Sequence, residues 1–156
     1  MIKRRLLVAA TLFCLGCDPN PPRRAYGCSD PTPAIPLVYV VQDSTDQLAC
    51  VRLDLRRDEG SIEVPGIRVT GGWQLVTAIR VTSACDHILG RVRILELEPS
   101  ATRAERGTGH VDLEGSTVAD MAVDLEFAAA PDGSLDPSTI YLSAAGVETN
   151  EPCPLP

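Results

Sequence analysis

The segment Gly109–Phe127, GHVDLEGSTVADMAVDLEF, indicates the fold of this chain most directly. Polar and apolar residues alternate in Gly109–Glu114, and large apolar residues recur at every second position from Met121 to Phe127 in Val118–Phe127. The linker Gly115-Ser116-Thr117 separates these two stretches. Alternation with a period of two is typical of a strand with one buried face, and a short linker that contains glycine is typical of a hairpin. The segment therefore predicts a β-hairpin. The inner face of its second strand is expected to carry Met121, Val123, Leu125 and Phe127.

Further strands are expected on both sides of this hairpin. Runs with strand character occupy residues 37–42, 48–55, 61–64, 67–70, 73–83, 89–98 and 139–144. Pro65-Gly66 is a turn dipeptide, a shift of apolar parity within 89–98 predicts a bulge, and 103–106 is expected to form one helical turn. Turn signals recur every 8 to 12 residues, which is typical of sandwiches and barrels. We therefore predict an all-β fold, an antiparallel β-sandwich of about seven to nine strands, with a small β-barrel as the alternative.

The alternation also assigns faces in two of these strands. The residues expected on the core side are Val51, Leu53 and Leu55 in the run 48–55, and Trp73, Leu75, Ile79 and Val81 in the run 73–83. The residues expected on the opposite, polar side are Cys50, Arg52, Asp54, Gln74 and Arg80.

The first seventeen residues, MIKRRLLVAATLFCLGC, have the pattern of an export signal. Basic residues precede the apolar run Leu6–Leu15, which is too short to span a bilayer, since a spanning helix needs about 20 residues. Leu15-Gly16-Cys17 then resembles the lipobox of bacterial lipoproteins, although Cys14 stands where that class prefers leucine. The resemblance implies cleavage before Cys17 and attachment of a diacylglycerol to its thiol. An ordinary cleaved signal peptide is the alternative.

The cysteine count agrees with lipidation at Cys17. The chain has six cysteines, and cleavage after residue 16 removes Cys14 and leaves an odd number. If Cys17 carries the lipid, an even set stays available for disulfides in an oxidising compartment: Cys28, Cys50, Cys85 and Cys153. Four cysteines allow three connectivities. We favour Cys28–Cys50 with Cys85–Cys153, because Cys50 on its polar face can hold an overlying segment and Cys153 lies in a proline-rich tail.

Composition divides the chain into three parts. Residues 1–16 are the predicted signal peptide, residues 17–36 a lipid-anchored, proline-rich tether, and residues 37–156 the β-sandwich domain. Proline is poorly suited to a central strand, so the tether is expected to act as a spacer. The net charge of −7 becomes −10 after cleavage, when 11 basic residues face 21 acidic ones. This acidity argues against a surface that binds nucleic acid.

Few reactive side chains form a pattern. His110, Asp112 and Glu114 lie at alternate positions of one strand and therefore share a face. They are weak candidates for a divalent-cation or acid–base site, and a solvated polar face is the simpler interpretation. Asp86-His87 has no flanking pattern that supplies a nucleophile.

One loop and one set of aromatic residues have the side chains of possible binding sites. Asp132–Asp136 could offer oxygen ligands to calcium, but it lacks the spacing of a calcium loop and matches ordinary turn chemistry. Trp73, Tyr39 and Tyr141 would form a sugar-binding platform only if they were exposed. The cysteine spacings do not fit a structural metal site.

These observations predict a non-enzymatic module of the bacterial cell envelope, without catalytic residues or cofactor. Its lipid at Cys17 would hold it on the inner or outer membrane, and its structural or interaction role would involve other envelope proteins rather than nucleic acid. The alternative is a periplasmic or surface ligand-binding protein for a divalent cation or a small envelope molecule.

Overall fold

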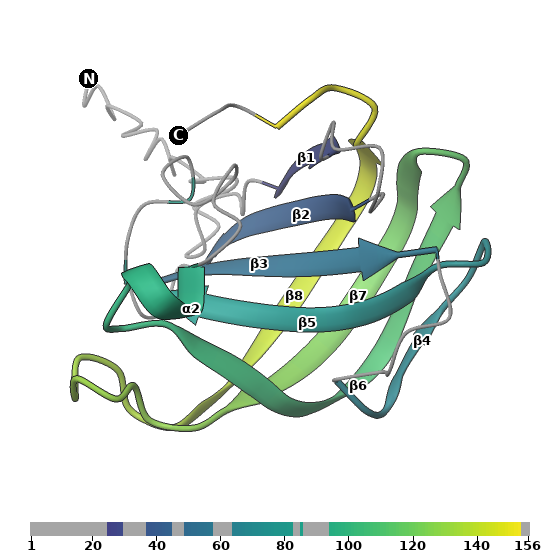
Figure 1. Cartoon of the computed structure of the whole chain (residues 1–156). Coiled ribbons are helices and arrows are strands. Elements are labelled where there is room, and N and C mark those ends of the chain that lie inside the picture. The colour runs from purple at the N-terminus through teal and green to yellow at the C-terminus, as the bar shows by residue number, and fades with distance from the viewer. Residues whose placement is uncertain are drawn as a thin grey trace, which may run out of the picture.

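The computed structural model describes residues 25–29, 37–44, 49–57, 64–82, 85 and 94–153. The elements in these ranges are β1 (Ala25–Ser29), β2 (Leu37–Ser44), β3 (Ala49–Arg56), β4 (Ile67–Val69), β5 (Gln74–Val81), α2 (Ile94–Leu97), β6 (Thr102–Glu114), β7 (Thr117–Phe127) and β8 (Ser138–Glu148) (Figure 1). The all-β prediction is confirmed, and the expected hairpin is present as β6 and β7. The predicted signal peptide, with Cys17, lies outside the described residues.

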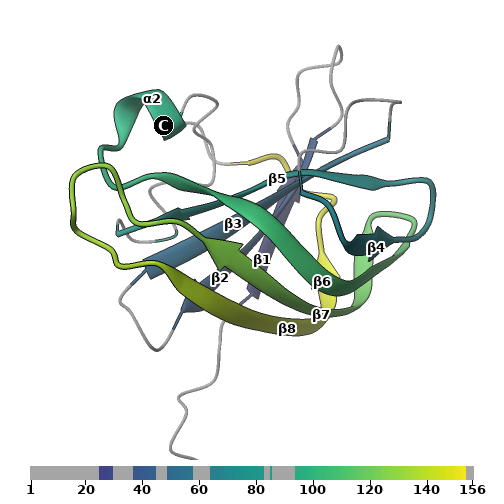
Figure 2. The ribbon, with the colours of Figure 1, turned by 90° about the horizontal axis from the view of Figure 1, so that it is seen from below.

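The strands form one curled antiparallel sheet in the order β1-β2-β3-β5-β6-β7-β8, and β4 pairs in parallel with β6. β5 pairs with β6 only at Ile79↔Arg103 and Arg80↔Thr102, and the sheet turns at this short junction. On one side of it lie β1, β2, β3 and β5, and on the other lie β4, β6, β7 and β8. The strands of these two walls cross, as Figures 1 and 2 show. The result is a half-barrel with its core between the walls.

β3 and β7 supply the centre of the core, as their alternation predicts. The side chains that alternate along these two strands are almost completely buried: Val51, Leu53, Leu55, Met121, Val123, Leu125 and Phe127. β8 adds Ile140 and Leu142 to the same cluster. Burial of each large aliphatic or aromatic side chain contributes roughly 1.5–3 kcal/mol. This layer is therefore a main source of the stability of the domain.

β5 departs from the predicted faces because it contains a bulge. Leu55 pairs with Leu75 whereas Asp54 pairs with Thr77, so Val76 is an extra residue in β5. An extra residue reverses the alternation of the side chains beyond it. The prediction that placed Ile79 and Val81 with Trp73 and Leu75 was therefore wrong. Ile79 and Val81 instead form a second, smaller cluster with Cys50 and Cys85.

The face of β3 that was expected to be polar is buried, and beyond the bulge Ile79 and Val81 of β5 lie on the same side as Cys50. Cys50 and Arg52 are each 2% exposed, and Asp54 is 7% exposed. Arg52 and Asp54 pair through Nε and Oδ1, 2.7 Å apart, and Nη2 of Arg52 donates a hydrogen bond of 2.9 Å to Oδ2 of Asp54. The two charges thus compensate each other where solvent is excluded.

Arg80, which was expected on the polar face, lies fully buried on the core side of β5. Its Nη1 donates to the carbonyl oxygen of Asp136 at 3.0 Å and to the hydroxyl of Ser138 at 2.6 Å, and its Nη2 donates to the carbonyl oxygen of Ala128 at 2.8 Å. The guanidinium also lies 5.1 Å from the ring centroid of Phe127. Burial lowers the pKa of Arg80, and nearby Asp136 opposes this shift. Arg80 therefore joins β5 to the loop between β7 and β8.

Two segments differ from the predicted secondary structure. Within 89–98, where a bulged strand was expected, residues 94–97 form the short helix α2. Residues 103–106, expected to form a helical turn, belong to β6, which is 13 residues long. The pairing of β6 with both β5 and β7 explains this difference, because tertiary hydrogen bonds override weak local preferences.

β1 lies within the segment that was expected to be a tether. It pairs with β2 as the end strand of the sheet, where Tyr26 faces Val41 and Cys28 faces Tyr39. An end strand needs hydrogen-bond donors on one side only, so a proline-rich neighbourhood is compatible with it. The paired sheet therefore begins at Ala25 rather than near residue 37.

The described residues contain two disulfides, but the favoured pairing was wrong. The bonds are Cys28–Cys153 and Cys50–Cys85. The C-terminal segment passes beside β1, where Ser29 N–H donates to the Glu151 carbonyl at 2.8 Å and Cys153 N–H donates to the Ser29 carbonyl at 2.9 Å. Cys28 thus meets the tail instead of Cys50. This disulfide and these hydrogen bonds join the two ends of the curled sheet.

Candidate functional site

The strongest cluster of polar side chains lies on the outer face of β6 and β7. His110 and Asp112 project from β6 on the solvent side, because Val111 and Leu113 take the core side. Asp120 projects from β7 directly opposite Asp112. The predicted face shared by His110 and Asp112 is therefore confirmed. Glu114 is exposed near the hairpin turn and is not part of the cluster.

A bulge in β7 brings Asp120 into this cluster. Leu113 pairs with Val118 whereas Asp112 pairs with Asp120, so Ala119 is the extra residue. A regular hairpin that turns at Gly115-Ser116 would place Ala119 opposite Asp112. The sequence contains a signal of this shift, because Val118 is apolar although it is out of phase with Met121. Both side chains are buried in the structure. Asp120 was not among the site residues predicted from the sequence.

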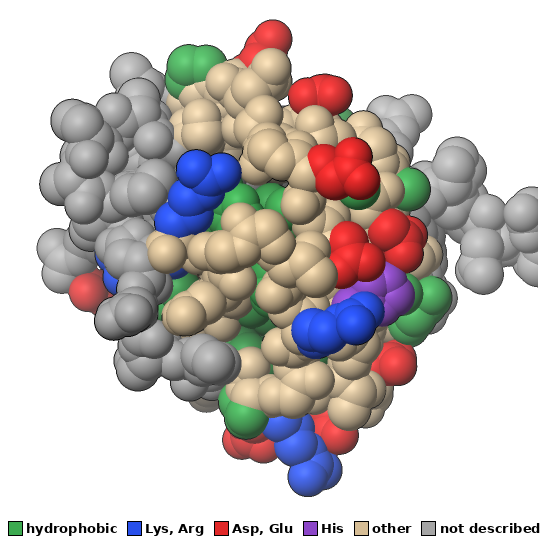
Figure 3. Space-filling view, turned by 90° about the vertical axis from the view of Figure 1, so that its right-hand side faces the viewer, with side chains coloured by type: hydrophobic (Ala, Val, Ile, Leu, Met, Phe, Trp, Pro, Cys, Tyr) green, Lys and Arg blue, Asp and Glu red, His purple; other side chains and the backbone are tan. Residues whose placement is uncertain are grey.

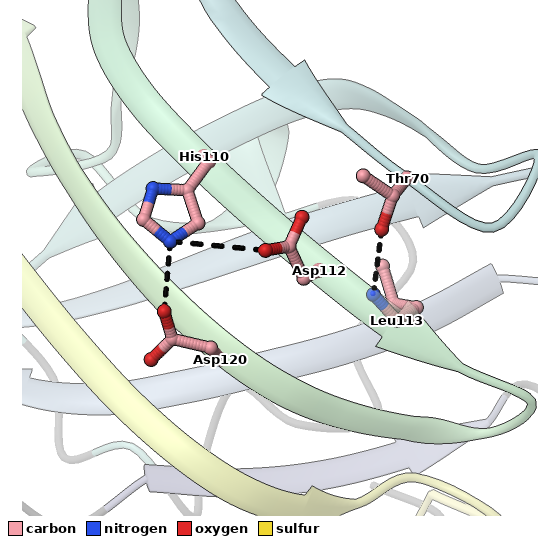
Figure 4. A network of polar contacts seen from close by, with 5 residues as sticks. All are labelled: Thr70, His110, Asp112, Leu113 and Asp120. Carbon is pink, nitrogen blue, oxygen red and sulfur yellow. Dashed lines mark hydrogen bonds and ion pairs between the residues drawn. The ribbon is translucent and has the colours of Figure 1, made fainter.

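The three side chains converge on one nitrogen atom. Nε2 of His110 lies 2.8 Å from Oδ2 of Asp120 and 3.9 Å from Oδ2 of Asp112 (Figure 4). When Nε2 carries a proton, it donates a hydrogen bond to Asp120. The other oxygen of Asp112, Oδ1, is shielded from solvent and has no hydrogen-bond partner within the described part of the chain. The carboxylate of Asp112 is therefore only partly satisfied.

Two carboxylates that face each other across a strand pair repel one another. Asp112 and Asp120 occupy such a position, and a positive charge between them would offset this repulsion. A protonated His110 is one source of that charge. Figure 3 shows acidic side chains gathered around the histidine, with a basic side chain beside it. Arg68 of β4, which pairs with His110 in the parallel register, is an exposed basic neighbour on this face.

The same three groups could hold a divalent cation. One oxygen from each carboxylate and one imidazole nitrogen lie within 4.8 Å of one another. In a tetrahedral site with bonds of about 2.0–2.1 Å, ligand atoms lie about 3.3 Å apart. The separations of 2.8 and 3.9 Å bracket this value. The third separation, between the two carboxylate oxygens, is at most 4.8 Å, so the three groups lie close enough together to be ligands of one ion.

Among the described residues, the other candidates from the sequence do not come together in a site. Trp73 is buried, which leaves Tyr141 without an exposed tryptophan beside it. Asp86 and His87 lie outside the described residues. Asp132 accepts hydrogen bonds from the hydroxyl of Ser134 at 2.6 Å and from its backbone N–H at 3.0 Å. These bonds lower the pKa of Asp132, the hydroxyl having the larger effect, and they fit the turn interpretation of this loop.

Comparisons with known proteins found no match among protein-family models, curated proteins or solved structures. The features of the chain itself therefore define its class: a small all-β domain, closed by two disulfides, with a His/Asp/Asp cluster on its outer face. Disulfides persist in oxidising compartments, so this class of domain belongs outside the reducing cytoplasm. No helix among the described residues has the length and apolar character that crossing a membrane requires.

Proposed function

We propose that this chain is a lipid-anchored, non-enzymatic module of the bacterial cell envelope that acts by presenting its surface to other envelope proteins. The observation that carries the proposal is the distribution of its cysteines. The two disulfides use Cys28, Cys50, Cys85 and Cys153. Of the two remaining cysteines, Cys14 lies in the apolar run of the predicted signal peptide and Cys17 ends the lipobox-like sequence. Cys17 is therefore the cysteine for which lipidation provides a role.

The position of β1 limits the distance between the proposed lipid and the domain. Cys17 and Ala25 are eight residues apart, and an extended chain covers at most about 3.3–3.6 Å per residue. The anchor would therefore hold the start of β1 within about 29 Å of the lipid attachment point. Arg23 and Arg24, which directly precede β1, would then be close enough to contact anionic head groups.

Replacement of Cys17 tests the anchor. In the Cys17→Ala variant we expect loss of metabolic fatty-acid labelling and release of the protein from the membrane fraction. The reason is that the variant lacks the thiol to which the diacylglycerol would be attached, and stable anchoring needs two or more acyl chains. Cys14→Leu is the control, because it introduces the residue that the lipobox class prefers at this position, and it should keep both properties. Fatty-acid labelling and membrane retention of Cys17→Ala at the level of the parent protein would contradict the proposal.

A second candidate function, binding of a divalent cation, is favoured by the convergence of Asp112 and Asp120 on Nε2 of His110. One imidazole and two carboxylates suit zinc better than calcium, which prefers six to eight oxygen ligands. In this function the protein would bind an ion on its outer sheet face and would remain non-enzymatic.

Zinc titration followed by thermal unfolding tests this candidate. At a free zinc concentration about 100 times the dissociation constant, we expect stabilisation by about 2.7 kcal/mol, reversed by a chelator. His110→Ala should abolish the stabilisation, whereas Glu114→Gln, on the same strand face but outside the cluster, should keep it. Equal stabilisation of the parent protein and of His110→Ala, or no stabilisation of either, would exclude the site.

A further inference from the structure

The open side of the half-barrel contains a groove between its two end strands. The groove has a volume of about 440 Å³ and is lined by Ala25–Gly27 of β1 and Ser143–Glu148 of β8. It narrows at Gly27, where a Cβ atom would lie 2.4 Å from the carbonyl oxygen of Glu148. Beyond this contact the Cys28–Cys153 disulfide holds the ends together. The two end strands are thus fixed at one end of the groove.

The edge of β8 carries neither charge nor proline over most of its length, and Gly146, with φ 65°, lies near its C-terminal end. Among the described residues, this strand of 11 residues pairs with β7 and with no other strand. Edge strands commonly carry lysine, proline or an inward-facing charge, which prevents pairing with another chain. Residues 138–147 contain no proline and no charged residue. In Figure 2, β8 is the outermost of the strands β6, β7 and β8. Its edge is therefore a suitable template for an additional strand.

Charge indicates which kind of strand would pair there. The outer face of β7 places Asp124 opposite Tyr141 and Asp120 opposite Ala145. Ala145 is small and exposed, so Asp120 is accessible from this edge. Asp124 is reached diagonally past the small, exposed Ser143, because the exposed Tyr141 lies directly opposite it. A strand added beside β8 would lie about 9–10 Å from β7. Lysine and arginine side chains are long enough to extend across β8 toward the carboxylates of β7. Asp124 has no ion-pair partner among the described residues.

We propose that β8 offers its free edge to an extended segment of a partner protein, which carries Lys or Arg at alternate positions and adds a strand beside Ser143–Ala145, with its basic side chains toward Asp120 and Asp124. In such strand addition, main-chain hydrogen bonds supply affinity and alternate side chains supply specificity. This inference rests on the proposed function, because it assigns the surface through which the envelope module would bind a partner.

A synthetic peptide tests the proposal on the full-length protein in detergent. The probe is acetyl-Thr-Lys-Val-Lys-Val-Lys-Thr-amide, and its counterpart has Glu in place of each Lys. We expect the basic peptide alone to bind, and bound peptide to slow hydrogen exchange of the amides in residues 143–146. Asp124→Asn should weaken binding roughly tenfold. Asp132→Asn, which removes the same charge from the loop between β7 and β8, should leave the affinity unchanged.

Three results would overturn the proposal. They are equal binding of the acidic peptide, binding without protection of residues 143–146, and no binding of the basic peptide. A second copy of this chain could also pair with the edge of β8, and sedimentation of the protein alone tests this alternative. If the protein forms a dimer that Ser143→Lys dissociates, the edge serves self-association. That result would contradict a basic partner. The same preparation is assayed for the lipid on Cys17. Failure of the peptide with acylated Cys17 contradicts strand addition alone, whereas absence of the lipid contradicts the proposed anchor.

Discussion

Replacement of Arg80 by methionine is expected to destabilise the domain by about 3–5 kcal/mol. The change removes the donors that satisfy the carbonyl oxygens of Ala128 and Asp136 and the hydroxyl of Ser138. A buried acceptor left without its donor costs about 1–3 kcal/mol, and methionine fills the space without supplying a hydrogen bond. Since domains of this size are stable by about 5–15 kcal/mol, the loss would be a large part of the total.

Urea denaturation of matched variants measures this effect. Arg106→Met is the control, because Arg106 is exposed and forms an ion pair with Glu126 at the surface, where such a pair contributes about 1 kcal/mol or less. A decrease for Arg80→Met that is no larger than the decrease for Arg106→Met would show that Arg80 does not join β5 to the β7–β8 loop as described.

Removal of the Cys28–Cys153 disulfide is expected to have an effect of similar size. The bond closes a loop with a sequence separation of 125 residues, for which the chain-entropy model gives about 5 kcal/mol of stabilisation. The double variant Cys28→Ser with Cys153→Ser should therefore unfold at much lower urea concentration. The control is Cys50→Ser with Cys85→Ser, which opens a loop with a separation of 35 and should lose about 4 kcal/mol.

Peptide mapping under non-reducing conditions identifies the pairing independently. We expect crosslinked peptides that contain Cys28 with Cys153 and Cys50 with Cys85. Peptides that join Cys28 to Cys50 would contradict the path of the C-terminal segment beside β1. In the double variant without Cys28–Cys153, faster hydrogen exchange should be largest in β1 and residues 149–153, because these segments would then be held by backbone hydrogen bonds without the covalent link.

The sequence predicted strands well where alternation was regular. β3, β7 and the hairpin were predicted because each has one apolar face, which is a local property of the chain. Beyond a bulge, the sequence did not predict correctly on which side of the sheet each side chain lies. Val76 reverses the alternation in β5, and for this reason Arg80 was expected in the wrong environment. The parity of Val118 against Met121 could have revealed the second bulge, and with it Asp120.

The features that depend on distant segments could not be predicted from the sequence. Cys28 pairs with Cys153 because the chain after β8 returns beside β1, and no local pattern encodes that path. β1 itself forms because β2 offers a partner, although prolines surround it in the sequence. The candidate cluster was predicted only in part for the same reason, since Asp112 and Asp120 become neighbours through the register of two strands.

Mass spectrometry of the mature N-terminus tests the central claim, which is that a lipid on Cys17 anchors a disulfide-closed domain. The protein is extracted from membranes of the cells that make it and digested without reduction. We expect an N-terminal peptide that begins at Cys17 and carries the mass of a diacylglycerol, while the other four cysteines of the mature chain occur in disulfides. An N-terminal peptide that begins elsewhere, or one in which Cys17 has a free thiol, would contradict it.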